Sequence, residues 1–329
     1  MASLTSNDTI ESLQARVAEL TALLTANDIA VPESKGASAS AGESKTDSSA
    51  AGSAAGSTEG FMTIPDDAGD LEEAVEILND EPGDWKGLIL PAGEFVIPKA
   101  ACGPGGWGAE AGMLTVPPGF TVRGAGDSTI IQGKFGFEPF DKYMCTGCTP
   151  GAPVTYENCW LETTGSNFEV RKWGDSELIF NNCTFSFKFI CNGVPNEMFR
   201  IWGTDVKEGE KPVTVRFNNC KFVVNGRDKI QGFSKYCIHV DGPGGYAEMT
   251  DCVINEEDVA GNCALYVTGK GSVVDIRGAA TDISKQKNGI WAESEGLINI
   301  NLPRRPKVVK DNRCEDVIKV KEGEVKYVK

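Results

Sequence analysis

The sequence is poor in the features that mark a secreted protein or one that binds nucleic acid. Its 329 residues include a single histidine, and 32 Lys and Arg residues stand against 47 Asp and Glu residues, giving a net charge of -15. A polyanionic partner requires a clustered basic face, and the one basic cluster, LPRRPKVVK (302–310), is typical of a solvated turn on an acidic surface. We therefore expect neither nucleic acid nor an anionic membrane as a partner.

The N-terminus lacks the basic start and the apolar run of a signal peptide, and no stretch is long enough to cross a bilayer. We therefore expect synthesis in the cytoplasm, and the final location stays open, with a virion as one alternative. The 11 cysteines are an odd number, which without a secretory signal favours free buried thiols over a disulfide framework. Cys145 and Cys148 have the spacing of a redox pair or half a zinc site, but no second pair follows, so a loop pair of thiols is the simpler interpretation.

The first 60 residues differ in composition from the rest of the chain. Residues 1–30 carry apolar side chains at alternating steps of three and four, the seam of a coiled coil. The seam consists of Ile10, Leu13, Val17, Leu20 and Leu24. Because it is short, a dimer, a trimer and a helix that docks on a partner all stay open. Residues 31–60 are almost all Ser, Ala, Gly, Glu and Lys, which predicts a disordered linker, so the globular domain is expected over residues 61–329.

A short motif, Phe-Asn-Asn-Cys, occurs at 180–183 and 217–220 and belongs to a longer repeat. The aligned small residues are Ala125, Cys159, Cys183, Cys220, Cys252, Ala279 and Pro303. The residues before them, in all copies but the last, are Gly124, Asn158, Asn182, Asn219, Asp251 and Gly278. Gly, Asn and Asp tolerate a left-handed backbone, so each copy is predicted to bend at this position. The cysteines would then stack inward as small apolar fillers.

A second set of strand-like segments lies upstream of these bends. The segments are 170–173, 200–204, 237–241, 264–268, 289–293 and 317–321. Three short strands per copy predict an all-β fold, the right-handed parallel β-helix. The stretch DAGDLEEAVEILND (67–80) has an apolar helical face that suits a cap over the first coil, and GLILPAGEFVI (87–97) would form the first wall.

The order of cap helix, LILPAGEFVI (88–97), LTVPPGFTVRGAGDSTIIQG (114–133) and Asn-Cys repeats resembles the pectate-lyase-like right-handed β-helix superfamily over residues 61–329. The run GLININLPRRPKVVKDN (296–312) is similar to the last coils of uncharacterised right-handed β-helix proteins from unicellular marine algae and their large DNA viruses. The resemblance implies the fold. It leaves the function open, because the superfamily contains lyases, hydrolases, epimerases, tailspikes and surface proteins without activity.

The resemblance implies that saccharide lies across the outer face of one column of strands. Strict alternation directs Ile201, Ile238, Leu265, Ile290 and Ile318 inward. It directs outward a first row of Arg171, Trp202, His239, Tyr266, Trp291 and Lys319, and a second row of Trp173, Thr204, Asp241, Thr268, Glu293 and Lys321. The rings of the first row predict an exterior ladder for the apolar faces of sugars. Alternatively, a loop or a partner covers these rings, or they only stabilise neighbouring strands.

The candidate carbohydrate-binding residues are Arg200, Trp202, His239, Asp241, Tyr266, Trp291 and Glu293. Asp241 and Glu293 are two strands apart in the alignment, roughly 9.6 Å, which is wide for the paired carboxylates of a glycosidase. Arg200 or Lys172 could serve as a base, although such side chains on an exterior strand are usually solvated. His239 has no carboxylate or nucleophile placed beside it by the sequence.

The Asp-rich hydrolase motifs of the superfamily and the Asp-Pro-His-Glu of its epimerase are absent from the chain. We therefore predict no catalytic residue, metal or cofactor, with Ca²⁺ expected only if the chain is a lyase. The leading interpretation is a non-enzymatic structural or adhesive protein that binds a polysaccharide and self-associates through its N-terminal helix. The alternatives are a lyase, hydrolase or epimerase acting on acidic glycans, and an intracellular scaffold that binds protein.

Overall fold

The computed structural model describes residues 59–80, 84–97, 118–133, 135–137, 151–164, 167–170, 177–188, 197–203, 212–224, 235–255, 263–301 and 309–328. The described residues belong to one compact unit, Ser57–Lys329. The predicted N-terminal helix, the predicted linker up to residue 58 and the Cys145 and Cys148 pair lie outside the described residues.

The described part of the chain is built from parallel β-sheets, with one helix, α2 (Leu71–Asp80). The ten-stranded sheet has the order β1 (Phe61–Thr63), β2 (Gly87–Ile89), β4 (Thr121–Arg123), β7 (Val154–Glu157), β10 (Glu177–Asn181), β13 (Val213–Asn218), β16 (Gly245–Thr250), β19 (Val273–Arg277), β22 (Leu297–Asn301) and β24 (Glu324–Val328). Two seven-stranded sheets complete the fold, and the predicted all-β class is confirmed.

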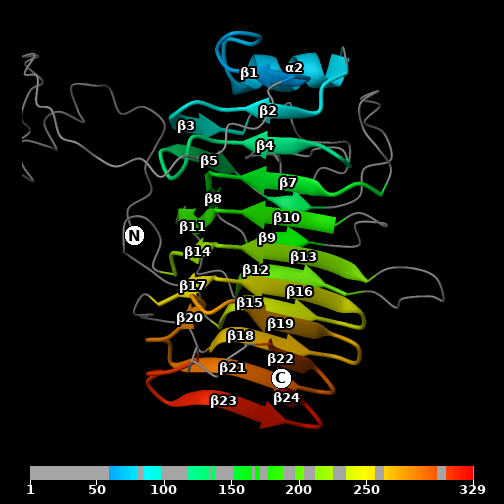
Figure 1. The fold of residues 1–329 in the computed structure, drawn as a ribbon, viewed down its shortest axis with the longest axis vertical. Coiled ribbons are helices and arrows are strands. Elements are labelled where there is room, and N and C mark those ends of the chain that lie inside the picture. The colour runs from blue at the N-terminus through cyan, green and yellow to red at the C-terminus, as the bar shows by residue number, and fades with distance from the viewer. Residues whose placement is uncertain are drawn as a thin grey trace, which may run out of the picture. The chain divides into compact units, whose positions relative to one another are not determined.

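The first seven-stranded sheet, the β3–β20 sheet, has the order β20 (Asp282–Ile283), β17 (Val253–Ile254), β14 (Lys221–Phe222), β11 (Thr184–Lys188), β8 (Trp160–Thr164), β5 (Thr129–Gly133) and β3 (Gly93–Val96). The second, the β6–β23 sheet, has the order β23 (Glu315–Val320), β21 (Asn288–Glu293), β18 (Cys263–Thr268), β15 (Tyr236–Asp241), β12 (Glu197–Trp202), β9 (Phe168–Val170) and β6 (Gly136–Phe137). From β7 to β21, consecutive strands enter the three sheets in turn (Figure 1). This arrangement is consistent with a parallel β-helix.

The bend between the ten-stranded sheet and the β3–β20 sheet follows the predicted Asn ladder. Asn158, Asn182, Asn219 and Asp251 have φ angles of 53°, 52°, 51° and 53°, in the left-handed region. The amide of Asn182 donates a hydrogen bond of 3.1 Å to the Asn158 side chain, and the amide of Asn219 donates one of 2.9 Å to Asn182. Asn182 and Asn219 therefore both turn the chain and bind the copy before them.

The cysteines after these bends are buried fillers, as predicted. Cys159, Cys183, Cys220 and Cys252 are almost fully buried, and the sulfur atoms of Cys159 and Cys183 lie 3.8 Å apart. Burial, together with the hydrogen bond to the neighbouring thiol, raises the pKa of Cys183 well above its ordinary value. The thiol therefore stays neutral and acts as an apolar side chain rather than a nucleophile.

Two copies of the repeat differ from the predicted alignment. Asp282 pairs with Val253 and Ile130 pairs with Trp160, so Thr281 and Thr129 stand at the cysteine position, and the exposed Ala279 and Ala125 do not. In the first copy, moreover, the left-handed residue is Gly126, with a φ of 98°, and not Gly124.

The Gly-Ala copies have longer bends than the Asn-Cys copies, and in each a threonine hydroxyl binds the extra backbone. Thr129 accepts a hydrogen bond from the amide of Ala125 and donates one to the carbonyl of Pro91, both 2.8 Å. Thr281 donates one of 2.6 Å to the carbonyl of Arg277. The copy at Pro303 lies outside the described residues.

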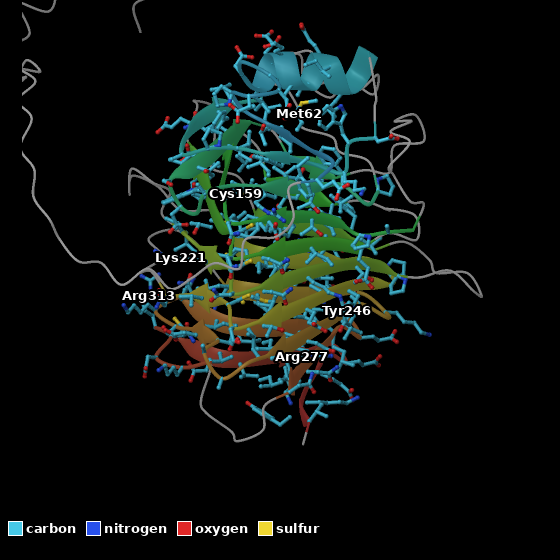
Figure 2. All side chains as sticks on the ribbon, turned by 45° about the horizontal axis from the view of Figure 1, so that its top comes forward. Met62, Cys159, Lys221, Tyr246, Arg277 and Arg313 are labelled. Carbon is cyan, nitrogen blue, oxygen red and sulfur yellow. The ribbon has the colours of Figure 1, made fainter. Side chains whose placement is uncertain are left out.

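The predicted cap helix is present as α2. Asp70 accepts a hydrogen bond from the amide of Glu73, and the Glu73 carboxylate accepts one from the amide of Gly69, a reciprocal capping arrangement that starts the helix. Leu71, Ala74 and Val75 are buried, and they belong to the same core as Met62. Met62 lies beneath α2 at one end of the interior (Figure 2).

Candidate functional site

The candidate residues lie on the outer face of the β6–β23 sheet. Strand pairing aligns the inward side chains of Phe199, Ile238, Leu265 and Ile290, all of which are fully buried. The residue after each of them is therefore directed outward. This outward row contains Arg200, His239, Tyr266 and Trp291, each paired with the next across adjacent strands.

The register corrects the predicted ladder at Trp202. Trp202 pairs with Asp241, and Arg200 takes its place beside His239. The prediction aligned Ile201 with Ile238, whereas the sheet aligns Phe199 with Ile238. Because side chains alternate with a period of two, this shift of two residues keeps Trp202 on the outer face and moves it to the neighbouring row.

The predicted side-chain directions in the last strand of this sheet, β23, are wrong. Ile318 pairs with Trp291 and Lys319 pairs with Ala292, so Ile318 belongs to the outward row and Lys319 to the inward one, the reverse of the prediction. A shift of one residue exchanges the two faces of a strand. Of the remaining predicted outward residues, Arg171, Trp173 and Thr204 lie outside the described residues.

We use the term aromatic face for this surface and the side chains that contact it. Its members are Glu169, Glu197, Arg200, Trp202, Tyr236, His239, Asp241, Tyr266, Trp291 and Glu293. The rings pack against one another. Those of Tyr236 and Tyr266 are nearly parallel, with their centroids 4.3 Å apart, and those of Tyr266 and Trp291 pack edge to face, with their centroids 5.5 Å apart. Ring-to-ring packing therefore stabilises neighbouring strands, and the half-exposed rings present their remaining surface outward.

Tyr236 and Glu197 are members that sequence reasoning missed. They are the first residues of β15 and β12 and pair with each other. Strict alternation from Ile238 and Phe199 would direct both inward, yet Tyr236 stacks on Tyr266 and Glu197 contacts His239. Their positions follow from how the strands begin at the edge of the sheet, for which the sequence carries no periodic signal.

His239 and Glu197 form a buried pair. His239 is 6% exposed, and its Nδ1 lies 3.2 Å from Oε1 of Glu197. Burial raises the pKa of the Glu197 carboxyl, but the hydrogen bond with His239 and the charge of Arg200 outweigh it, so the pKa lies below its ordinary value. An ionised carboxylate only accepts hydrogen bonds, so Nδ1 of His239 donates to Glu197.

The other carboxylates of the aromatic face also have partners. Asp241 binds Arg200 at 2.6 Å, and Glu169 accepts a hydrogen bond of 2.7 Å from Nε1 of Trp202. The Arg200 guanidinium lies 3.5 Å from the centroid of the Trp202 ring, a cation–π contact.

Glu293 is held by two groups, one on each of its carboxylate oxygens. It accepts a hydrogen bond of 3.0 Å from the hydroxyl of Tyr266, and Lys321 approaches its other oxygen to 2.8 Å. Burial and the Glu293 carboxylate raise the pKa of Tyr266, so its hydroxyl stays a neutral donor.

Three nitrogen atoms of this face are buried and make no hydrogen bond. They are Nε of Arg200, Nε2 of His239 and Nε1 of Trp291. Buried polar groups in folded proteins almost always have a partner, and a buried group without one requires an explanation. The aromatic face therefore holds polar atoms at Arg200, His239 and Trp291 whose hydrogen-bonding capacity the protein does not use.

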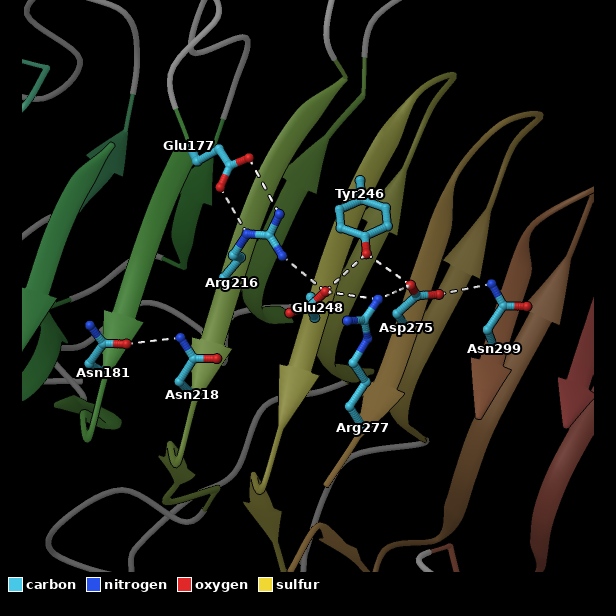
Figure 3. Close-up of polar contacts among 9 residues, drawn as sticks. All are labelled: Glu177, Asn181, Arg216, Asn218, Tyr246, Glu248, Asp275, Arg277 and Asn299. Atoms are coloured by element: carbon cyan, nitrogen blue, oxygen red, sulfur yellow. Dashed lines mark hydrogen bonds and ion pairs between the residues drawn. The ribbon is translucent and has the colours of Figure 1, made fainter. Parts of the chain in front are cut away.

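The outer face of the ten-stranded sheet carries a second cluster, which the sequence analysis did not identify. This charged network contains Glu177, Arg216, Tyr246, Glu248, Asp275, Arg277 and Asn299 (Figure 3). Glu248 forms ion pairs with Arg216 at 2.9 Å and with Arg277 at 3.2 Å, and Asp275 accepts hydrogen bonds from Tyr246 and Asn299. Hydrogen bonding and opposite charge within the network match each charged group to a partner, which is typical of a stabilising cluster.

The two carboxylates considered from the sequence are not adjacent in the sheet. The register places Asp241 and Glu293 two strands apart, with β18 between them. Among the described residues, no three His, Cys, Asp or Glu side chains gather in a way that could hold a metal ion.

The described part of the chain contains one helix, α2, which is too short and too polar to cross a membrane. Comparison with known protein families, with characterised proteins and with solved structures finds no match to this chain.

Proposed function

We propose that residues 61–329 form a right-handed parallel β-helix and that this domain binds a saccharide on its aromatic face without catalysing a reaction. The winding of the chain through three parallel sheets supports the fold, as does the hydrogen-bonded Asn ladder at the bends. Parallel crossover connections are almost always right-handed, which supplies the hand. A structural or adhesive role, as part of a virion or a cell surface, follows from a bound saccharide and from self-association of the N-terminal segment.

One observation carries the binding proposal: buried nitrogen atoms without hydrogen-bond partners lie among half-exposed rings. Nε2 of His239 and Nε1 of Trp291 are such atoms, and the rings of Tyr236 and Tyr266 lie between and beside them. A sugar has apolar ring faces that pack on aromatic side chains, and its hydroxyls both donate and accept hydrogen bonds. A sugar is therefore the kind of ligand that can use the rings and the nitrogen atoms together.

One observation favours the enzymatic alternative. A histidine whose Nδ1 is held by a carboxylate, as His239 is by Glu197, presents Nε2 as a base. We keep this as the second candidate function. Its reaction would be the removal of a proton from a bound glycan or from water.

A glycan array probed with the full chain tests the binding proposal. We expect a defined group of glycans to bind, and we expect Trp291→Ala to weaken that binding by about tenfold or more, because a central aromatic side chain carries much of an interface's energy. Tyr327→Ala is the matched control, since Tyr327 is an aromatic side chain 56% exposed on the ten-stranded sheet. No binding on the array, or equal losses in both variants, would contradict the proposal.

Mass spectrometry of each bound glycan after prolonged incubation separates the two candidates. A binding protein leaves the mass of the glycan unchanged. Cleavage, elimination or loss of a substituent that disappears in His239→Gln would establish the enzymatic alternative instead.

A further inference from the structure

We infer that the ligand of the aromatic face is an uncharged saccharide and that the face excludes uronates. This inference rests on the proposed function and adds the chemical class of the ligand. It follows from two properties of the face: the partners of its cations and the number of its carboxylates.

Two cations at this face are paired with carboxylates. Arg200 binds Asp241 at 2.6 Å, and one face of its guanidinium is covered by the ring of Trp202. Lys321 binds Glu293 at 2.8 Å. A uronate entering this surface would have to displace a protein carboxylate from its partner, and the displaced carboxylate would lose a charge-assisted hydrogen bond.

The carboxylates would also repel an acidic glycan. Glu169, Glu197, Asp241 and Glu293 all lie on the aromatic face, on a protein whose net charge is -15. Like charges brought together at an interface destabilise a complex. An uncharged glycan does not meet this repulsion.

The test uses pairs of oligosaccharides that share a backbone and differ in charge. Suitable pairs are cello-oligosaccharides and their C6-oxidised forms, manno-oligosaccharides and oligomannuronates, and methyl-esterified and de-esterified oligogalacturonates. Calorimetric titration of the full chain should show the uncharged member of a bound pair binding at least about tenfold more tightly. That affinity should stay the same between about 0.05 M and 0.5 M NaCl, because salt screens charge–charge attraction and not hydroxyl hydrogen bonds.

Two variants sharpen the test. Asp241→Asn releases Arg200, and Glu293→Gln releases Lys321, so each should raise the affinity for the acidic member by about two- to fivefold, the range of single exposed ion pairs. Glu324→Gln is the control, because Glu324 is an exposed carboxylate in β24 of the ten-stranded sheet, paired with Lys326. It should change the affinity for neither member.

The outcomes distinguish the inference from the proposal on which it rests. Tighter binding of the acidic member, equal binding of both members, or an affinity for the uncharged member that falls with salt would overturn the inference and leave saccharide binding intact. If neither member of any pair binds and the array is also empty, the proposed function itself is wrong.

Discussion

The aromatic face and the charged network occupy the outer surfaces of two different sheets and use their polar groups in opposite ways. In the charged network, Glu248 and Asp275 each receive several donors from adjacent strands. On the aromatic face, Nε2 of His239 and Nε1 of Trp291 are buried and make no hydrogen bond. Both surfaces are built on parallel strands in continuous register. The difference teaches that the fold provides the rows of outward positions, and that the matching of donors to acceptors decides how completely a row satisfies its own hydrogen bonds.

The strongest test of this comparison is Glu248→Ala in the charged network. Glu248 is 7% exposed and pairs with both Arg216 and Arg277. Its loss should lower the free energy of unfolding by about 1.5–3 kcal/mol, the range for hydrogen bonds to charged groups. Urea denaturation measures the change. Glycan affinity should be unaltered, and a variant of normal stability that no longer binds glycan would break the comparison.

A pair of conservative substitutions compares one hydrogen-bonding group on each surface. Trp291→Phe keeps a ring but removes the Nε1 donor, so we expect glycan affinity to fall about fivefold and stability to change little, since that donor has no partner in the protein. Tyr246→Phe removes a hydroxyl that donates to Asp275 at 2.9 Å, so it should lower the free energy of unfolding by about 1 kcal/mol without affecting binding. The opposite pattern in titration calorimetry and urea denaturation would reverse the roles assigned to the two surfaces.

The charged network should also make stability depend on acid pH. Burial raises the pKa of Asp275, but hydrogen bonds from Asn299, Tyr246 and Arg277 together lower it by more than burial raises it. The folded pKa therefore lies below the ordinary value of 3.8. The unfolded state therefore binds this proton more readily, and the stabilisation is present above pH 3.8 and is lost as the pH falls through the folded pKa.

Urea denaturation as a function of pH measures this dependence. Asp275→Asn should flatten the loss of stability below pH 3.8 and leave the profile near neutrality parallel to that of the unchanged protein. An unaltered acid limb would show that Asp275 does not contribute.

The smallest expected effect belongs to an exposed ion pair at the end of the ten-stranded sheet. Glu324 and Lys326 are 2.5 Å apart and more than half exposed. Glu324→Gln should change the free energy of unfolding by less than about 0.5 kcal/mol, because water and salt screen such a pair. A loss as large as that of Glu248→Ala would mean that exposure does not separate the two kinds of ion pair.

Local rules were sufficient for much of the fold. The left-handed bends at Asn158, Asn182, Asn219 and Asp251 were predicted because few residue types tolerate that backbone. The inward cysteines followed from their position after these bends, and the outward direction of His239, Tyr266 and Trp291 followed from alternation along each strand. The cap helix followed from its apolar face.

The register between neighbouring strands could be determined only from the folded chain. A shift of two residues leaves every side chain on its face, so alternation could not distinguish Arg200 from Trp202 as the neighbour of His239, and only the pairing of β12 with β15 decided it. Similarly, the sequence held no sign that the bends at Ala125 and Ala279 are longer and place a threonine at the cysteine position.

By itself the sequence determined the bends of the Asn-Cys copies and the outward direction of His239, Tyr266 and Trp291, because backbone preference and alternation act over a few neighbouring residues. The tertiary structure alone decided which outward side chains meet. Glu197 reaches His239, and Arg216 reaches Glu248, across strands that are 32 to 42 residues apart in the chain. Those contacts depend on register and on the geometry of strand ends. They decide why one surface satisfies its own hydrogen bonds and the other leaves Nε2 of His239 and Nε1 of Trp291 without a partner.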